Sequence, residues 1–141
     1  MLLQLIYASR PFGFDGLSLD GILVSARLNN MRDGITGALI CREDLYLQLL
    51  EGLPKAVAAA FARIARDDRH TEVVKLVSRS VESRLFPEWA MRDDPARSWM
   101  WTQEQVKAGA VAKASADEIE TIFVRLAKEL RQGELVASGS Q

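Results

Sequence analysis

The fold of this chain is constrained most by residues 35–54, which predict a β-hairpin. Residues 35–41 form one apolar strand, residues 42–44 a short polar turn, and residues 45–51 the return strand. Side chains alternate between the two faces of a strand, so Leu45, Leu47 and Leu49 share one face of the return strand. Tyr46, Gln48 and Leu50 share the other face, and both faces are mostly apolar, which predicts a sheet covered on both sides. Gln48 is the exception, because a buried carboxamide needs hydrogen-bond partners.

Elements before and after the hairpin complete the order βαββαββ over residues 2–91. Alternation predicts a first strand at 2–9 and a fourth at 71–80. Pro87 places a short fifth strand, 84–91, at an edge or makes it start late. Ser18 is suited to cap a helix that Gly34 ends, and Pro54 is suited to the first turn of a second helix. This order predicts an α+β, ferredoxin-like sandwich with a five-stranded mixed sheet and both helices on one face.

The C-terminal part predicts helices that cover the other face of the sheet. A polar linker leads to two capping boxes, at residues 102–105 and 115–118. The first begins a short helix that runs to about Lys113. The second begins an amphipathic helix that ends near Gly133, with an apolar stripe of Ile119, Ile122, Phe123, Leu126 and Leu130. We therefore expect a domain at residues 1–93 and a helical extension at 94–141, frayed from about residue 134.

Composition excludes several classes of function. The chain has 141 residues, 48% of them hydrophobic, and a net charge of −1, which argues against a nucleic-acid partner. One cysteine, Cys41, and one histidine, His70, make neither a disulfide nor a metal cluster. No apolar run approaches the roughly 20 residues that span a bilayer, and the N-terminus does not resemble a signal peptide. Catalytic triads and phosphate-binding glycine motifs are absent from the sequence as well. We expect a soluble, cytoplasmic protein.

Three polar side chains are predicted to converge on the layer between the sheet and its two helices. Tyr7 comes from the first strand, Asn30 from the end of the first helix, and Gln48 from the hairpin. Each has an ordinary alternative: a core tyrosine, a helix C-cap and an edge residue, respectively. Together they would line an apolar slot with hydrogen-bonding groups, which suits a planar heterocycle. Arg63, Arg66 and Arg69 lie near the end of the second helix, and their ordinary alternative is a solvated surface.

Six short motifs occur in an order and spacing that together indicate a family. They are Tyr-Ala-Ser at 7–9, Asn-Asn at 29–30, Ile-Thr-Gly-Ala-Leu at 35–39, Gln-Leu-Leu-Glu-Gly at 48–52, Arg-Asp-Asp-Arg-His at 66–70 and Phe-Pro-Glu-Trp-Ala-Met at 86–91. Through these motifs residues 2–91 resemble a BLUF domain, a blue-light sensor that uses FAD. The rest of the chain shows no recognisable effector domain, so the whole is similar to a short, stand-alone BLUF protein.

The resemblance implies a photosensory flavoprotein rather than an enzyme, with FAD between the two helices. Tyr7 corresponds to the tyrosine that gives an electron and a proton to excited flavin and recovers both. Gln48 corresponds to the glutamine that bridges tyrosine and flavin, and its rotation or tautomerisation would shift the flavin absorption to the red. Asn30 corresponds to a residue that binds the pyrimidine edge of the ring, with a weaker role for Asn29. The remaining implied cofactor contacts are Arg63, Ile64, Asp67, Arg69 and His70.

Trp89 and Met91 correspond to the signalling pair of the family, and alternation along the last strand places both on one face. We expect light to rearrange Gln48 and to shift this strand, although Trp89 could instead be a static core anchor. The signal would pass to an unidentified partner protein in trans, and the chain is expected to form a homodimer. The sequence leaves open whether Trp89 or Met91 lies beside Gln48 in the dark, how long the lit state lasts, and whether FAD or FMN is bound.

Other functions remain possible on the same sandwich. An acylphosphatase-like enzyme would use Arg10 and Asn30, but it would give Gln48 no role. A flavin oxidoreductase would need an open face for its substrate. A flavin-free adaptor would use the aromatic patch at residues 99–101 and the last helix.

Overall fold

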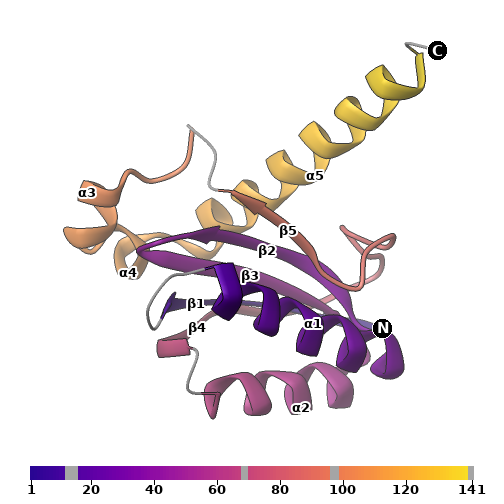
Figure 1. The fold of residues 1–141 in the computed structure, drawn as a ribbon, viewed down its shortest axis with the longest axis horizontal. Helices are drawn as coiled ribbons and strands as arrows, with labels where there is room; N and C mark the ends of the chain where they lie inside the picture. The colour runs from indigo at the N-terminus through magenta and orange to yellow at the C-terminus, as the bar shows by residue number, and fades with distance from the viewer. Residues whose placement is uncertain (12–15, 68–69, 96–98, 140–141) are drawn as a thin grey trace.

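The computed structural model describes residues 1–11, 16–67, 70–95 and 99–139 (Figure 1). In chain order its elements are β1 (Leu2–Pro11), α1 (Gly16–Asp33), β2 (Thr36–Arg42), β3 (Leu45–Gly52), α2 (Pro54–Ala65), β4 (His70–Val81), β5 (Arg92–Pro95), α3 (Gln103–Lys107), α4 (Ala110–Lys113) and α5 (Ala116–Gly139). Among these described residues, no helix is both long and apolar enough to cross a lipid bilayer.

The first four strands form an antiparallel sheet in the order β4-β1-β3-β2, and the short β5 adds in parallel beside β2. The order βαββαβ with β1 and β3 in the centre is that of a ferredoxin-like sandwich, so the predicted α+β class is confirmed. Helices α1 and α2 lie on one side of the sheet and α5 crosses the other (Figure 1). We call these the helix face and the far face.

The predicted hairpin is present, and its tight pairing explains one glycine. Gly37 pairs with Leu50, and a Cβ added at Gly37 would collide with the backbone carbonyl oxygen of Leu49. Only glycine therefore lets β2 and β3 approach in this register. Every residue of β3 is buried, so this strand is enclosed by the rest of the fold.

Alternation along the strands creates two hydrophobic cores. On the far face, Leu45, Leu47 and Leu49 pack under α5, and on the helix face Tyr46 and Leu50 pack under α1 and α2. The far-face core also contains Ile6, Ala8, Ala38, Ile40, Val77, Phe86, Met100, Ile119, Phe123, Leu126, Ala127 and Leu130. The helix-face core also contains Leu5, Tyr7, Ile22, Leu23, Ile35, Leu39, Val57, Ala60 and Met91. The sequence prediction of a sheet covered on both sides is confirmed.

The predicted fifth strand is misplaced. Residues 84–91 are irregular, and the strand that pairs with β2 begins only at Arg92. The backbone N–H groups of Leu85 and Phe86 donate to the carboxylate of Glu51, so they are not available for a strand ladder. Long-range polar contacts thus override the strand-like sequence of this segment.

The C-terminal helices follow their capping signals with two differences. Thr102 and Gln105 form the predicted capping box, and the Ser115 hydroxyl accepts from the Glu118 N–H. The first predicted helix is divided into α3 and α4 at Gly109, whose φ of 93° interrupts a right-handed helix. The second predicted helix corresponds to α5, which continues past Gly133 to Gly139.

Candidate functional site

A cavity of about 230 Å³ lies between α1 and α2, over β3. Each helix contributes side chains at the spacing i, i+3, i+4, i+7, which places them on one helical face. Apolar and polar side chains alternate in its lining, and the polar ones come from both helices and from β3. The lining residues are Ile22, Ser25, Ala26, Asn29 and Asn30 from α1, Gln48 and Leu50 from β3, and Ala60, Arg63, Ile64 and Asp67 from α2 and the residues after it.

Gln48 is held at the floor of this cavity between two side chains. Tyr7 lies directly opposite Gln48 in the pairing of β1 with β3, and its hydroxyl donates to Gln48 Oε1. On the other side, Gln48 Nε2 donates to the sulfur of Met91 at 3.1 Å. A thioether can only accept, and a protonated phenol needs an acceptor, so this orientation of the carboxamide satisfies both neighbours.

The phenol of Tyr7 is fully buried, and its ring packs 5.6 Å from that of Phe61. Burial raises the pKa of Tyr7 well above its ordinary value of 10.0, and the charge of Asp67 and the nearby Tyr46 raise it further. Tyr7 therefore keeps its proton and remains a hydrogen-bond donor to Gln48 at ordinary pH.

Helix α1 also holds the backbone that follows Trp89. Asn30 is buried, and its Nδ2 donates to the carbonyl oxygen of Ala90 at 2.8 Å. Arg27 Nε donates to the carbonyl oxygen of Met91 at 3.2 Å. The predicted core-facing position of Asn30 is confirmed, and its partner explains why a carboxamide is stable there.

An ion pair joins the two helices that border the cavity. Arg63 Nη2 of α2 lies 3.2 Å from Asp33 Oδ2, the last residue of α1. A hydrogen bond from Arg32 lowers the pKa of Asp33, and Arg63 lowers it further. Asp33 therefore stays charged, while Arg63 remains part of the cavity lining.

These side chains fit a flavin by the chemistry of their donors and acceptors. Three carboxamides, one guanidinium, one carboxylate and one hydroxyl line a slot that also has apolar walls, which suits a planar heterocycle with an imide-like edge. The volume lies just below the roughly 300–1,000 Å³ of small-molecule sites, which suits a ring system rather than a whole dinucleotide. Among the residues that the structure describes, no cluster of His, Cys, Asp and Glu could hold a metal ion.

Of the predicted site residues, the cavity brings together Asn29, Asn30, Gln48, Arg63, Ile64 and Asp67. Trp89 is elsewhere: it packs in the far-face core, with its ring 6.2 Å from that of Phe86, whereas Met91 lies in the helix-face core. The prediction that Trp89 and Met91 share a face is wrong, because strand alternation does not apply to an irregular segment. Arg69 and the side chain of His70 lie outside the described residues.

Sequence reasoning missed two polar residues. Ser25 lines the cavity one helical turn before Asn29, and this spacing alone would have indicated it. Glu51 is buried on the far face, where its carboxylate also accepts from Gln4 Nε2 at 3.0 Å. Glu51 lies two residues after Leu49, so strand alternation places both side chains on the same face. This position could have indicated that Glu51 is buried.

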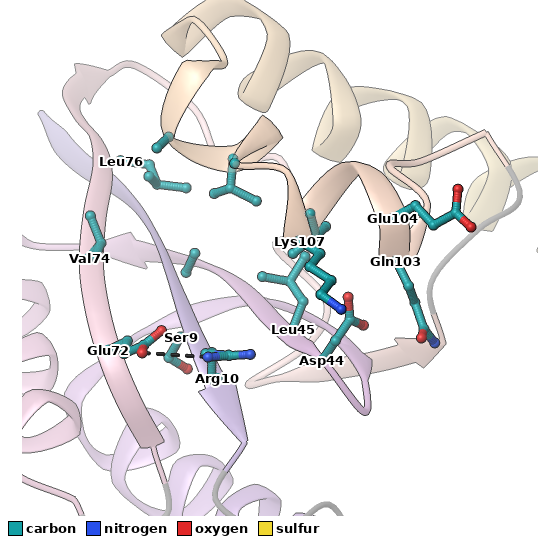
Figure 2. Close-up of a pocket in the computed structure, with 15 residues that line it drawn as sticks. Ser9, Arg10, Asp44, Leu45, Glu72, Val74, Leu76, Gln103, Glu104 and Lys107 are labelled. Carbon is teal, nitrogen blue, oxygen red and sulfur yellow. Dashed lines mark ion pairs between the residues drawn. The ribbon is translucent and has the colours of Figure 1, made fainter.

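A larger hollow of about 870 Å³ lies on the far face, between the ends of β1 and β4 and the short helices α3 and α4 (Figure 2). Apolar side chains such as Val74 and Leu76 form its floor, and an exposed Arg10–Glu72 ion pair lies at its rim. None of the described residues predicted for the flavin site lines this hollow, and of the two residues considered for an acylphosphatase-like enzyme only Arg10 does. The smaller cavity, where the predicted polar groups converge, is therefore the candidate site.

Comparison with known proteins identifies the family of this chain. The family model for sensors of blue light using FAD, BLUF, matches residues 2–92. The chain is 35% identical over 85 residues to photoactivated adenylate cyclase subunit beta of Euglena gracilis, which is 60% of this chain and 10% of that protein. It is 32% identical over 87 residues, 61% of this chain and 22% of that protein, to the blue light- and temperature-regulated antirepressor BluF of Escherichia coli (strain K12).

Among solved structures, the dark state of BlrB, a BLUF protein, is similar with a TM-score of 0.72 and 28% identity, over 91% of this chain and 96% of that one. A bacterial light-regulated adenylyl cyclase is similar with a TM-score of 0.65 and 26% identity, over 98% of this chain and 36% of that one. The match spans only about a tenth of the Euglena cyclase subunit, so the similarity to that protein concerns one part of it.

Proposed function

Because this chain belongs to the BLUF family, the sensors of blue light using FAD, we propose that Tyr7 and Gln48 carry its photochemistry and that Met91 receives the result. BLUF domains bind flavin, and the cavity between α1 and α2 is the site whose side chains fit it. The proposal depends above all on one observation: Tyr7, Gln48 and Met91 form a buried hydrogen-bonded series, and its middle member Gln48 lines that cavity.

The raised pKa of Tyr7 determines how its proton can move. A phenol that stays protonated at every ordinary pH does not lose its proton by simple ionisation. Bound flavin supplies the absorption of blue light and a site for one electron. When Tyr7 gives up an electron, its O–H becomes strongly acidic, and the acceptor to which it donates is Gln48 Oε1. Return of the electron restores the basicity of the phenol oxygen and brings the proton back.

Gln48 converts this transfer into a change of hydrogen bonding. A carboxamide is a donor and an acceptor at once, so either rotation or tautomerisation changes which group it offers to each neighbour. Both routes alter the N–H that donates to the Met91 sulfur in the structure. Met91 would then lose the hydrogen bond from Gln48 to its sulfur, and the residues around it would shift to a second arrangement.

The other cavity residues would hold and orient the cofactor. Asn29 and Asn30 offer carboxamides to the ring, and the Arg63 guanidinium suits a carbonyl or phosphate oxygen. Asp67 and Ile64 complete the α2 side of the slot. We also propose roles for Arg69 and His70 near the cofactor tail, from the family motif alone.

The signal would reach a partner protein, which the chain does not identify. Relatives named as adenylate cyclase and antirepressor show that similar domains occur in proteins with different outputs. We propose a separate effector in trans and a homodimeric sensor, and both are testable by light scattering and by co-purification in light and darkness.

An absorption spectrum before and just after blue light tests the proposal. We expect a flavin spectrum that shifts to the red and recovers in the dark. Gln48→Leu should bind flavin without the shift, whereas Gln103→Leu, an exposed glutamine that bonds Glu43 on the surface, should behave as wild type. A Gln48→Leu chain that retains the full shift would refute the assigned role, and flavin without any shift in the wild type would refute the photoreceptor mechanism.

A further inference from the structure

Residues 84–91, which we call the crossing segment, contact both faces of the sheet. At one end, Met91 lies in the helix-face core and contacts Gln48. At the other, Leu85 and Phe86 pack in the far-face core beneath α5. Between them, the carbonyl oxygen of Trp89 accepts from the N–H of Gly37 at 3.1 Å, so the segment passes along the β2 edge of the sheet. It is thus a direct physical connection between the cavity floor and α5.

Glu51 anchors the far-face end of this segment. Its carboxylate oxygens accept from the N–H of Leu85 at 2.8 and 2.9 Å and from the N–H of Phe86 at 3.1 Å. Glu51 is fully buried, and hydrogen bonds to a buried carboxylate are short, directional and strong. Arg84 adds a bond from Nη1 to the carbonyl oxygen of Glu51 at 3.0 Å. The start of the segment is therefore fixed to β3.

Helix α5 contacts Leu85 and Phe86 on the far face of the sheet. Arg131 Nη2 donates to the carbonyl oxygen of Leu85 at 2.8 Å. The ring of Phe123 packs edge-on against that of Phe86, with 6.3 Å between centroids. Leu85 therefore lies between Glu51, which binds its N–H, and Arg131, which binds its carbonyl oxygen.

One strand holds both ends of the crossing segment. Gln48 and Glu51 lie three positions apart on β3, so alternation directs them to opposite faces. Because every residue of β3 is buried, the strand is a rigid reference against which the segment can move. A displacement of Met91 would therefore strain the Leu85 end of the segment, where the same residue is bonded to Glu51 of β3 and to Arg131 of α5.

We propose that Glu51 and Arg131 are positioning residues that couple the state of Gln48 to α5 through Leu85. This inference rests on the proposed function and specifies its output: a light-dependent change of α5 that needs both contacts. It predicts that photochemistry and output can be separated, since neither Glu51 nor Arg131 lines the cavity.

The test is hydrogen–deuterium exchange of α5 in the full flavin-loaded chain, in darkness and under blue light, alongside the absorption spectrum. Arg131→Met keeps the aliphatic stem and removes the bond to Leu85, and Glu51→Gln keeps the side-chain shape. The matched control is Arg125→Met, since Arg125 also lies on α5 but packs over the Trp99 ring at 4.4 Å. We expect wild type and Arg125→Met to show a red shift and a light-dependent change in α5 exchange.

Arg131→Met and Glu51→Gln should keep the red shift and lose the light-dependent change in α5. In darkness, Glu51→Gln should also exchange faster at the amides of Leu85 and Phe86. If Arg131→Met keeps both the red shift and the α5 response, the inference is overturned while the proposed function stands. If the wild type shows no red shift, the proposed function fails first and the inference falls with it. Arg131 is exposed, so its variant keeps the test decisive even if Glu51→Gln does not fold.

Discussion

Replacing Phe123 by alanine tests whether α5 is an integral part of the fold. Phe123 is fully buried on the far face and packs edge-on against Phe86. Truncating a buried phenylalanine to alanine costs about 3–5 kcal/mol, and the aromatic pair, worth about 0.5–1.5 kcal/mol beyond burial, places this site in the upper part of that range. Since domains of this size are stable by roughly 5–15 kcal/mol, the loss should be a large fraction of the total.

The assay is equilibrium unfolding in urea, followed by tryptophan fluorescence and by circular dichroism. The neighbouring Val124→Ala is the matched control, because Val124 is 47% exposed and surface changes stay within about 0.5 kcal/mol. A Phe123→Ala chain within about 1 kcal/mol of wild type would contradict the packing of α5 on the sheet. It would also remove the physical basis for any signal that reaches α5 through the far-face core.

Three further predictions follow from single contacts. Gly37→Ala should lower the unfolding free energy by about 3 kcal/mol in urea titrations, because its Cβ would collide with the Leu49 carbonyl oxygen. Asn30→Ala should cost about 1–3 kcal/mol by leaving the Ala90 carbonyl oxygen without this donor, and should weaken flavin binding in a titration. The raised pKa of Tyr7 means that only the unfolded chain loses this proton just above pH 10.0, so wild-type stability should fall more steeply there than that of Tyr7→Phe.

Local sequence signals were sufficient for most of the fold. The hairpin, Pro54 at the start of α2 and the capping box at Thr102 each depend on residues close together in the chain. Alternation along β3 also placed Gln48 correctly on the helix face, opposite its neighbour Leu49. These predictions succeeded because tertiary contacts reinforce the local preference instead of opposing it.

The segment before β5 could not be predicted in the same way. Its sequence around Trp89 and Met91 has strand-like alternation, but its backbone is fixed by hydrogen bonds to Glu51, which lies far from it in the sequence. Whether Trp89 or Met91 lies beside Gln48 depends on where the irregular backbone turns, and one additional residue in a turn reverses the face. In the structure Met91 is the neighbour, bound through its sulfur.

The position of Glu51 shows how a polar residue on a buried strand can be interpreted. A carboxylate enclosed by apolar side chains is stable only if donors reach it, and here three come from Gln4, Leu85 and Phe86. Two of these donors belong to the segment whose other end contacts Gln48. The same strand therefore carries a polar side chain that lines the cavity on one face and a polar side chain that binds the crossing segment on the other. This arrangement requires an odd separation along the strand, and Glu51 lies three positions after Gln48.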